Sequence, residues 1–173
     1  MRTLALLMAA TRVALSQNPA PCTGPEYHQM DFIIGRWAGV ESDIKGNDTT
    51  RTVTGSITTE ATLNGCALQG RWEYDSKGKT LFHATVISGY DTEKKQWRLA
   101  YADDVGNYQI YDGQLSGDSM AFVRARTVDG KPALARVTSF KTANGYRQTI
   151  ERSMDAGATW TLRAFVDFTR SSP

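Results

Sequence analysis

Residues 133–153 read ALARVTSFKTANGYRQTIERS, two runs of alternating apolar and polar side chains on either side of Asn144-Gly145. Alternation with a period of two is typical of a β-strand that buries one face. Asn and Gly favour tight hairpin turns, because they tolerate positive φ or bond their own turn. The stretch therefore predicts a β-hairpin, and the same rhythm continues from Arg36 to Arg170.

Turn residues divide this region into ten candidate strands. They span 36–45, 51–63, 66–75, 80–90, 96–102, 108–115, 119–128, 133–142, 146–153 and 159–169. Their short connections favour antiparallel pairing between chain neighbours, and pairing the tenth strand with the first would leave no free edge. We therefore predict an all-β fold, a single antiparallel meander β-barrel of about 8–10 strands. A two-sheet sandwich is less favoured, because nothing suggests long Greek-key crossovers.

Length and charge narrow the classes of protein to which this chain could belong. The 173 residues are enough for one domain with a sizeable core. The 20 basic and 18 acidic side chains are interspersed, so neither a nucleic-acid groove nor an anionic membrane surface is expected as partner. We expect no membrane span, no metal site and no cofactor, because apolar runs are short and the two histidines lack ligand-pair spacing. The expected oligomeric state is a monomer or a homodimer.

The first residues have the pattern of a signal peptide. Met1-Arg2 precedes an apolar run, Arg12 interrupts that run, and Ala14-Leu15-Ser16 offers a small-x-small cleavage step. We therefore expect a secreted or periplasmic protein; the alternative is the leader of a cytosolic protein. The chain would then consist of a signal-peptide-like leader over 1–16, an approach segment over 17–35 and a β-barrel domain over 36–170. Within the approach, Pro25 could begin a single helical turn.

The chain has two cysteines, Cys22 and Cys66. An even count in an exported protein predicts a disulfide. The bond would join the segment before the first strand to the start of the third strand, and it could add about 2–4 kcal/mol of stability. If the protein is cytosolic, the alternative is two unpaired thiols.

Residues 153–160 read SMDAGATW and match the pattern Ser-x-Asp-x-Gly-x-Thr-Trp, called the Asp box. This motif resembles a turn that repeats in sialidase propellers. A propeller would repeat it about every 40–50 residues, whereas this chain has it once. We therefore interpret Ser153, Asp155, Gly157 and Trp160 as the structural residues of a rigid hairpin.

Several motifs together resemble a family of secreted bacterial proteins of unknown function. They are Cys22, the stretch MDFIIGRW over 30–37, Gly65-Cys66, Gly89-Tyr90-Asp91, Trp97 and the Asp box. The opening with Gly35 and Trp37 is also similar to the calycin group, which includes lipocalins, fatty-acid-binding proteins and nitrobindin-like barrels. These resemblances imply a calycin-like barrel with a ligand cavity, in which Trp37 plugs the closed end. The chain departs from the family pattern at Ile33 and Ala156, and it lacks the axial histidine of a haem-binding barrel.

Alternate residues of a strand share a face, so the sequence also predicts what lines the interior. With Trp37 inside, Gly39 and Glu41 follow. The other inward sets are expected to be Leu68, Trp72 and Tyr74; Trp97, Leu99 and Tyr101; Tyr108, Ile110 and Asp112; Arg136, Thr138 and Phe140; Tyr146, Gln148, Ile150 and Arg152; and Trp160, Leu162, Ala164, Val166 and Phe168. From these we select as candidate ligand-binding residues Trp37, Glu41, Trp72, Tyr101, Tyr108, Arg136, Gln148 and Trp160.

Three classes of function fit such a barrel. The favoured one is a carrier or sensor of a small apolar or aromatic ligand, with Arg136 and Gln148 orienting a carboxylate where the ligand bears one. The second is a cofactor-independent lyase, isomerase or hydrolase in the same cavity, with Glu41 or His83 as acid or base. The third is a structural envelope protein with a packed interior.

Overall fold

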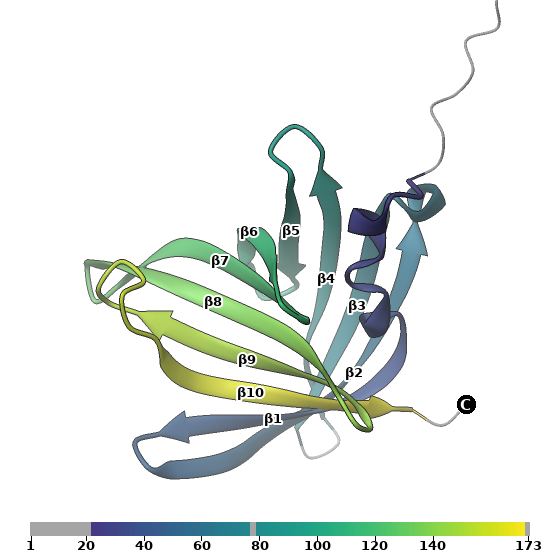
Figure 1. Ribbon diagram of the computed structural model, residues 1–173. Coiled ribbons are helices and arrows are strands. Elements are labelled where there is room, and N and C mark those ends of the chain that lie inside the picture. Colours follow the sequence, from purple (N-terminus) through teal and green to yellow (C-terminus); the bar gives the residue numbers. More distant parts are fainter. Residues whose placement is uncertain (1–21, 77–78, 172–173) are drawn as a thin grey trace, which may run out of the picture.

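Ten strands form a closed barrel in the computed structural model, which describes residues 22–76 and 79–171 (Figure 1). The predicted leader over 1–16 lies outside the described residues. The strands are β1 (Gly35–Lys45), β2 (Asp48–Thr62), β3 (Ala67–Ser76), β4 (Lys79–Asp91), β5 (Gln96–Asp103), β6 (Tyr108–Ser116), β7 (Ser119–Val128), β8 (Lys131–Thr142), β9 (Gly145–Ser153) and β10 (Thr161–Arg170). Three short 3-10 helices accompany them: η1 (Pro25–His28), η2 (Asp31–Ile33) and η3 (Leu63–Gly65). Within the described ranges, no helix is long and apolar enough to cross a membrane.

The strand order is that of a meander. Each strand pairs antiparallel with the next one in the chain, and β1 pairs with β10 from Trp37↔Arg170 to Asp43↔Ala164. This last ladder removes both free edges of the sheet. The predicted antiparallel β-barrel is therefore confirmed, as is the hairpin over 133–153, which is formed by β8 and β9.

The turn of that hairpin uses its glycine differently from the prediction. Gly145 does not have a positive φ; it is the first residue of β9. A Cβ atom at this position would overlap the carbonyl oxygen of Phe168 on β10. Glycine is therefore required because two strands approach closely, rather than because the turn is left-handed.

A bulge in β10 changes the face of the residues that precede it. Leu162 pairs with Glu151 and Ala164 pairs with Ile150, so Arg163 is an extra residue in β10 with no partner in β9. An extra residue reverses the inward and outward alternation on one side of the bulge. Ala164 therefore faces inward, whereas Leu162 faces outward.

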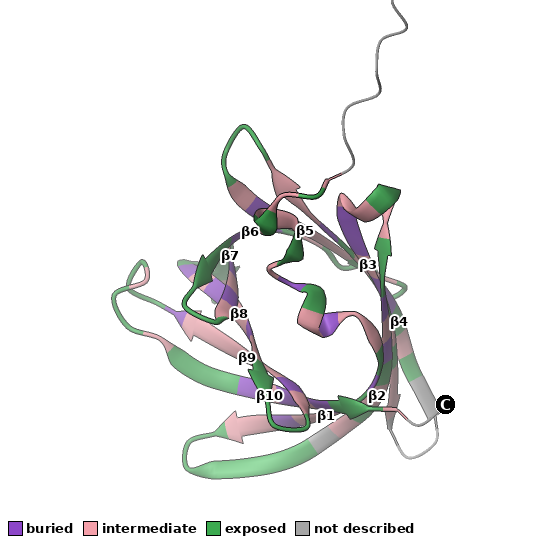
Figure 2. Cartoon of the chain, turned by 45° about the vertical axis from the view of Figure 1, so that its right-hand side comes forward, coloured by how far each residue is buried: buried purple, intermediate pink, exposed green. Residues whose placement is uncertain are grey.

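The η1 and η2 segment covers one end of the barrel, and in Figure 2 it lies inside the ring of labelled strands. Met30 and Ile33, which belong to this segment, are buried. The Trp97 indole donates to Gln29 Oε1 at 2.9 Å, and the Trp37 indole donates to the Ile33 carbonyl at 2.8 Å. These two bonds hold the segment against the inner wall. The predicted helical turn at Pro25 is confirmed as η1.

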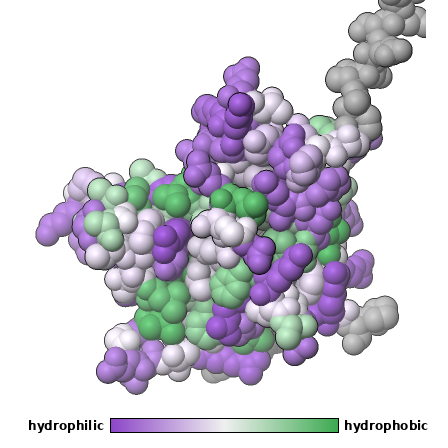
Figure 3. Space-filling model, in the orientation of Figure 1, coloured by the Kyte–Doolittle hydropathy of each residue, from purple (hydrophilic) through white to green (hydrophobic). Residues whose placement is uncertain are grey.

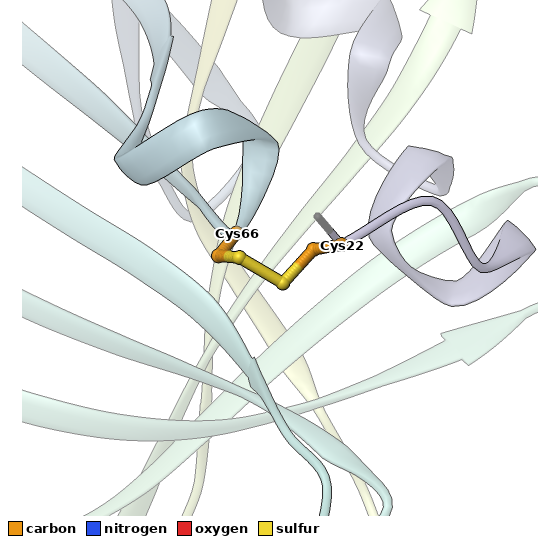
Figure 4. Close-up of a disulfide and its surroundings, with 2 residues drawn as sticks. All are labelled: Cys22 and Cys66. Atoms are coloured by element: carbon orange, nitrogen blue, oxygen red, sulfur yellow. A yellow bond between two sulfur atoms is a disulfide. The ribbon is translucent and has the colours of Figure 1, made fainter. Parts of the chain in front are cut away.

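A disulfide between Cys22 and Cys66 secures the same end of the barrel (Figure 4). It joins the chain just before η1 to the residue that follows η3 and leads into β3. The predicted bond is therefore confirmed. It fixes the start of the capping segment to the wall that the segment covers.

The outer wall is not uniformly polar. Tyr108, Ile110 and Ile87 are exposed on it, and Figure 3 shows hydrophobic patches scattered among hydrophilic residues on one face of the molecule. Apolar residues on both faces of a strand weaken the alternation that a sequence offers. Because of this mixture, the sequence of β6 does not show clearly which of its faces points into the barrel.

Candidate functional site

The interior of the barrel contains a partly open cavity of about 270 Å³. Met30 and Ile33 of the capping segment form one end of its lining, and the remaining walls come from the strands. The lining is mainly apolar and aromatic, and its larger strand residues are Ile57, Leu68, Trp72, Tyr74, Val86, Leu99, Tyr101, Tyr111, Phe122, Val137, Tyr146, Ile150 and Val166. An apolar cavity with few polar groups has the usual anatomy of a small-molecule site.

Two polar atoms in this lining have no partner. Thr59 Oγ1 and Trp72 Nε1 are buried and form no hydrogen bond within the described part of the protein. Both lie over Gly70, because a Cβ atom placed there would be 3.5 Å from Thr59 Oγ1 and 3.4 Å from Trp72 Nε1. Buried donors without partners are costly. Gly70 therefore leaves room for at most a methyl group beside these two unpaired donors, which form a small polar recess in an otherwise apolar wall.

Three other polar side chains of the lining bond to neighbours on the protein. Gln148 Nε2 donates to Ser139 Oγ at 3.0 Å, and the Tyr111 hydroxyl donates to Gln109 Oε1 at 2.6 Å. The Tyr101 hydroxyl donates to Asp103 at 2.9 Å. These side chains are held in fixed orientations, whereas the recess at Gly70 is unpaired.

Glu41 lies beside the main cavity in a smaller hollow of about 10 Å³, bounded by β1, β2, β3 and β10. Trp72 and Tyr74 line both spaces. Burial raises the pKa of the Glu41 carboxyl above its ordinary value, and the nearby Asp43 charge raises it further. Among the described residues, no group of three or more potential ligands could hold a metal ion.

Several candidate residues lie where the sequence placed them. Trp72, Tyr101 and Gln148 line the cavity, and Glu41 faces the adjoining hollow. Trp37 is buried at the capped end, where its ring meets Tyr146 edge to face at 5.0 Å. Their role in binding stays a prediction.

The predicted orientation of β6 is wrong. Tyr108 is 72% exposed, while Gln109 and Tyr111 line the cavity. Partners in a ladder share a face, and Tyr111 pairs with Leu99, which faces inward. The alternation of Tyr108 and Ile110 misled the prediction because the outer wall is itself apolar here. On the inner face of β6, Gly113 is required because a Cβ there would overlap the Phe122 ring.

The inward placement of Arg136 and Trp160 is also wrong. Val137 faces the cavity, so Arg136 faces outward, where it forms a two-pronged ion pair with Glu151 at 2.8 and 2.9 Å. Trp160 precedes the bulge at Arg163 and lies on the same outer face, with its ring 4.0 Å from the Arg136 guanidinium carbon. The bulge is the physical reason for the Trp160 error.

His83 is on the outer wall as well. Its side chain is 59% exposed, and Nδ1 lies 2.9 Å from Asp104 Oδ2. The neighbouring residue Ala84 is buried, consistent with an outward His83. His83 cannot act on a molecule inside the cavity from this position, so the interpretation of His83 as an acid or base in the cavity is wrong.

The Asp box forms a compact turn between β9 and β10. Asp155 accepts from the Thr159 amide at 2.9 Å and from the Thr159 hydroxyl at 2.6 Å, and the Ser153 hydroxyl donates to it at 2.7 Å. These bonds lower the pKa of Asp155 to about 2, with the Thr159 side chain contributing most. Gly157 has a φ of +95°, which favours glycine. The turn stabilises its own hairpin.

Comparison with known proteins places the chain within a family of undetermined role. The pattern of the family described as "Protein of unknown function (DUF1579)" matches residues 23–170. The search of the curated proteins found no match. Among solved structures, the chain is similar to the crystal structure of Rv2717c from M. tuberculosis, with a TM-score of 0.59 and 12% identity over 86% of this chain and 99% of that one. At this identity, the likeness supports the barrel fold alone.

Proposed function

Because the chain belongs to the DUF1579 family of proteins of unknown function, its role has to be argued from its cavity, and we propose that it is a binding protein for one small apolar or aromatic molecule. The cavity volume of about 270 Å³ lies just below the range of about 300–1,000 Å³ typical of ligand pockets. An apolar cavity of about 150 Å³ already binds benzene in another protein. The ligand is therefore expected to be small, on the scale of one or two rings.

The observation that carries this proposal is the unpaired recess at Gly70. An apolar cavity could be a mere packing defect, but a defect has no reason to contain buried donors without partners. A ligand with one acceptor atom on an apolar body would satisfy Thr59 Oγ1 and Trp72 Nε1 together, and the side chains around them would move aside to admit it because both atoms are buried. The cavity also argues against a fully packed envelope protein.

An extracytoplasmic location supports the role of a carrier or sensor. A structural disulfide such as Cys22–Cys66 persists in oxidising compartments and is rare in the cytosol. We propose that the protein is secreted or periplasmic and meets its ligand there.

Gly70→Ala tests the proposal at its most specific point. The new methyl group would lie 3.3 Å from Ile57 Cδ1 and would fill the recess below Thr59 and Trp72. We expect a loss of about fivefold to 100-fold in affinity for 2-naphthamide, a neutral aromatic probe with an acceptor oxygen, because a buried donor left unpaired costs about 1–3 kcal/mol. Isothermal titration calorimetry measures the affinity.

Gly89→Ala is the matched control. Gly89 lies on the outer face of β4, where a Cβ would be 3.4 Å from the Cys66 carbonyl oxygen. The same chemical change there should leave the affinity unaltered. Equal losses in both variants, or no binding to the unaltered protein, would contradict the proposed function.

A further inference from the structure

Strands β6 and β7 separate beyond a short ladder, and we call the place where they separate the opening between β6 and β7. Their ladder extends only from Ser116↔Ser119 to Asp112↔Val123. Beyond it, on the side away from the capping segment, the residues of β6 pair only with β5 and those of β7 pair only with β8. In Figure 1 the hairpin of β5 and β6 turns away from that of β7 and β8. Tyr111 and Phe122, which line the cavity, are the neighbours in sequence of the last ladder pair, Asp112↔Val123.

Arg124 is the first residue of β7 beyond this ladder, and it faces inward. It lies two positions after Phe122, which lines the cavity, and its guanidinium carbon is 5.4 Å from the centre of the Tyr111 ring across the opening. Its Nε atom is buried and has no hydrogen-bond partner within the described residues.

The sheet register places a second arginine beside it. Arg124 pairs with Ala135 on β8, and Ala135 pairs with Arg152 on β9. Directly paired residues share a face, so both arginines face inward on either side of a buried alanine that is 7% exposed. Arg124, Ala135 and Arg152 each lie two residues along their strand, about 6.7 Å, from a residue that lines the cavity. Those lining residues are Phe122, Val137 and Ile150 in turn.

The charges of these two arginines are not balanced in the way that three arginines of the outer wall are. Arg98, Arg136 and Arg147 on the outer wall each form an ion pair with a carboxylate, Asp112, Glu151 and Asp167 in turn. Within the described part of the chain, neither Arg124 nor Arg152 forms such a pair. The carboxylates that share the inner face, Glu41 and Asp43 on β1 and Asp103 on β5, are not within ion-pair distance of either arginine.

We propose that Arg124 and Arg152 together bind the oxyanion group of the cavity's ligand, so that this ligand is an amphiphile with an apolar body in the barrel and an anionic head at the opening between β6 and β7. The inference rests on the proposed function, because the arginines select a head group only if the cavity holds the body. Guanidinium groups present parallel N–H donors that match carboxylate and phosphate oxygens. The small side chain of Ala135 separates the two arginines in the sheet.

A pair of nearly isosteric probes tests the inference. We expect the unaltered protein to bind 2-naphthoate at least about tenfold more tightly than 2-naphthamide, since hydrogen bonds to charged groups are the stronger ones. Arg124→Gln and Arg152→Gln, on separate strands, should each reduce this ratio several-fold. Arg71→Gln, which removes the same charge from the outer wall beside Trp72, should leave the ratio unchanged. If Arg124→Gln does not fold, Arg152→Gln still tests the pair.

The outcomes separate the two proposals. Equal binding of both probes, or an equal fall in the ratio in Arg71→Gln, would overturn the arginine inference and leave the cavity proposal standing. Failure of both probes to bind would contradict the cavity proposal and this inference with it. A comparison of 2-naphthoate with 2-naphthyl phosphate identifies the preferred oxyanion as a carboxylate or a phosphate.

Discussion

Replacing Trp97 with alanine is expected to lower the free energy of unfolding by about 3–5 kcal/mol, the usual range for a buried tryptophan. Trp97 is 1% exposed and belongs to the core cluster that also contains Met30 and Trp37. Its indole also donates to Gln29 of the capping segment. The substitution therefore removes packing and releases the cap together. Urea unfolding followed by circular dichroism measures the change.

Trp160→Ala is the matched control for this prediction. Trp160 is only half-buried and lies on the outer face of the barrel against Arg136, so the same truncation should cost about 1–2 kcal/mol, the scale of a partly desolvated cation–π contact. Similar losses in the two variants would contradict the register, and with it the assignment of the inner face.

Removing the disulfide is the second large effect. We expect the double variant Cys22→Ser, Cys66→Ser to lose about 2–4 kcal/mol of stability. The bond closes a loop with a sequence separation of 44 residues, and without it the unfolded chain gains freedom. Affinity for the naphthyl probes should fall as well, because Met30 and Ile33 of the capping segment line the cavity.

Thermal unfolding with and without a reducing agent measures the disulfide effect. The unaltered protein should unfold at a lower temperature when reduced, while the double variant should be insensitive to the reductant. An unaltered protein whose stability does not respond to full reduction would contradict the assigned role of the bond.

The fold could be predicted from the sequence because its signals are local. Alternating strands, short turns and the placement of Pro25 each depend on a few neighbouring residues, and all point to the same barrel. Closure of β1 on β10 was predicted because it leaves no free edge, and it is seen in the ladder from Trp37 to Asp43.

The inner face could be predicted only where no irregularity intervenes. Trp72, Tyr101 and Gln148 were placed correctly because the alternation runs unbroken through them. Trp160 was misplaced because a single extra residue, Arg163, is invisible in the pattern. Tyr108 and Arg136 were misplaced because β6 and β8 carry apolar side chains on both faces. The prediction took the outer face of each of these strands for the inner one.

The polar residues of the site were harder to predict from the sequence than its apolar lining. Thr59 lies in a threonine-rich strand in which alternation marks neither face clearly. Gly70 is one of 15 glycines, and its role depends on side chains from β2 and β3 that meet only in the folded sheet. Arg124 and Arg152 are brought together across Ala135 by the register of three strands.

The central claim is that the barrel holds one small molecule in its cavity, and native mass spectrometry in the presence of 2-naphthamide tests it most directly. We predict a single adduct of one probe molecule per chain for the unaltered protein and for Gly89→Ala, and a much weaker adduct for Gly70→Ala. No adduct on the unaltered protein, or a ladder of several adducts that is equal in all three proteins, would contradict the claim.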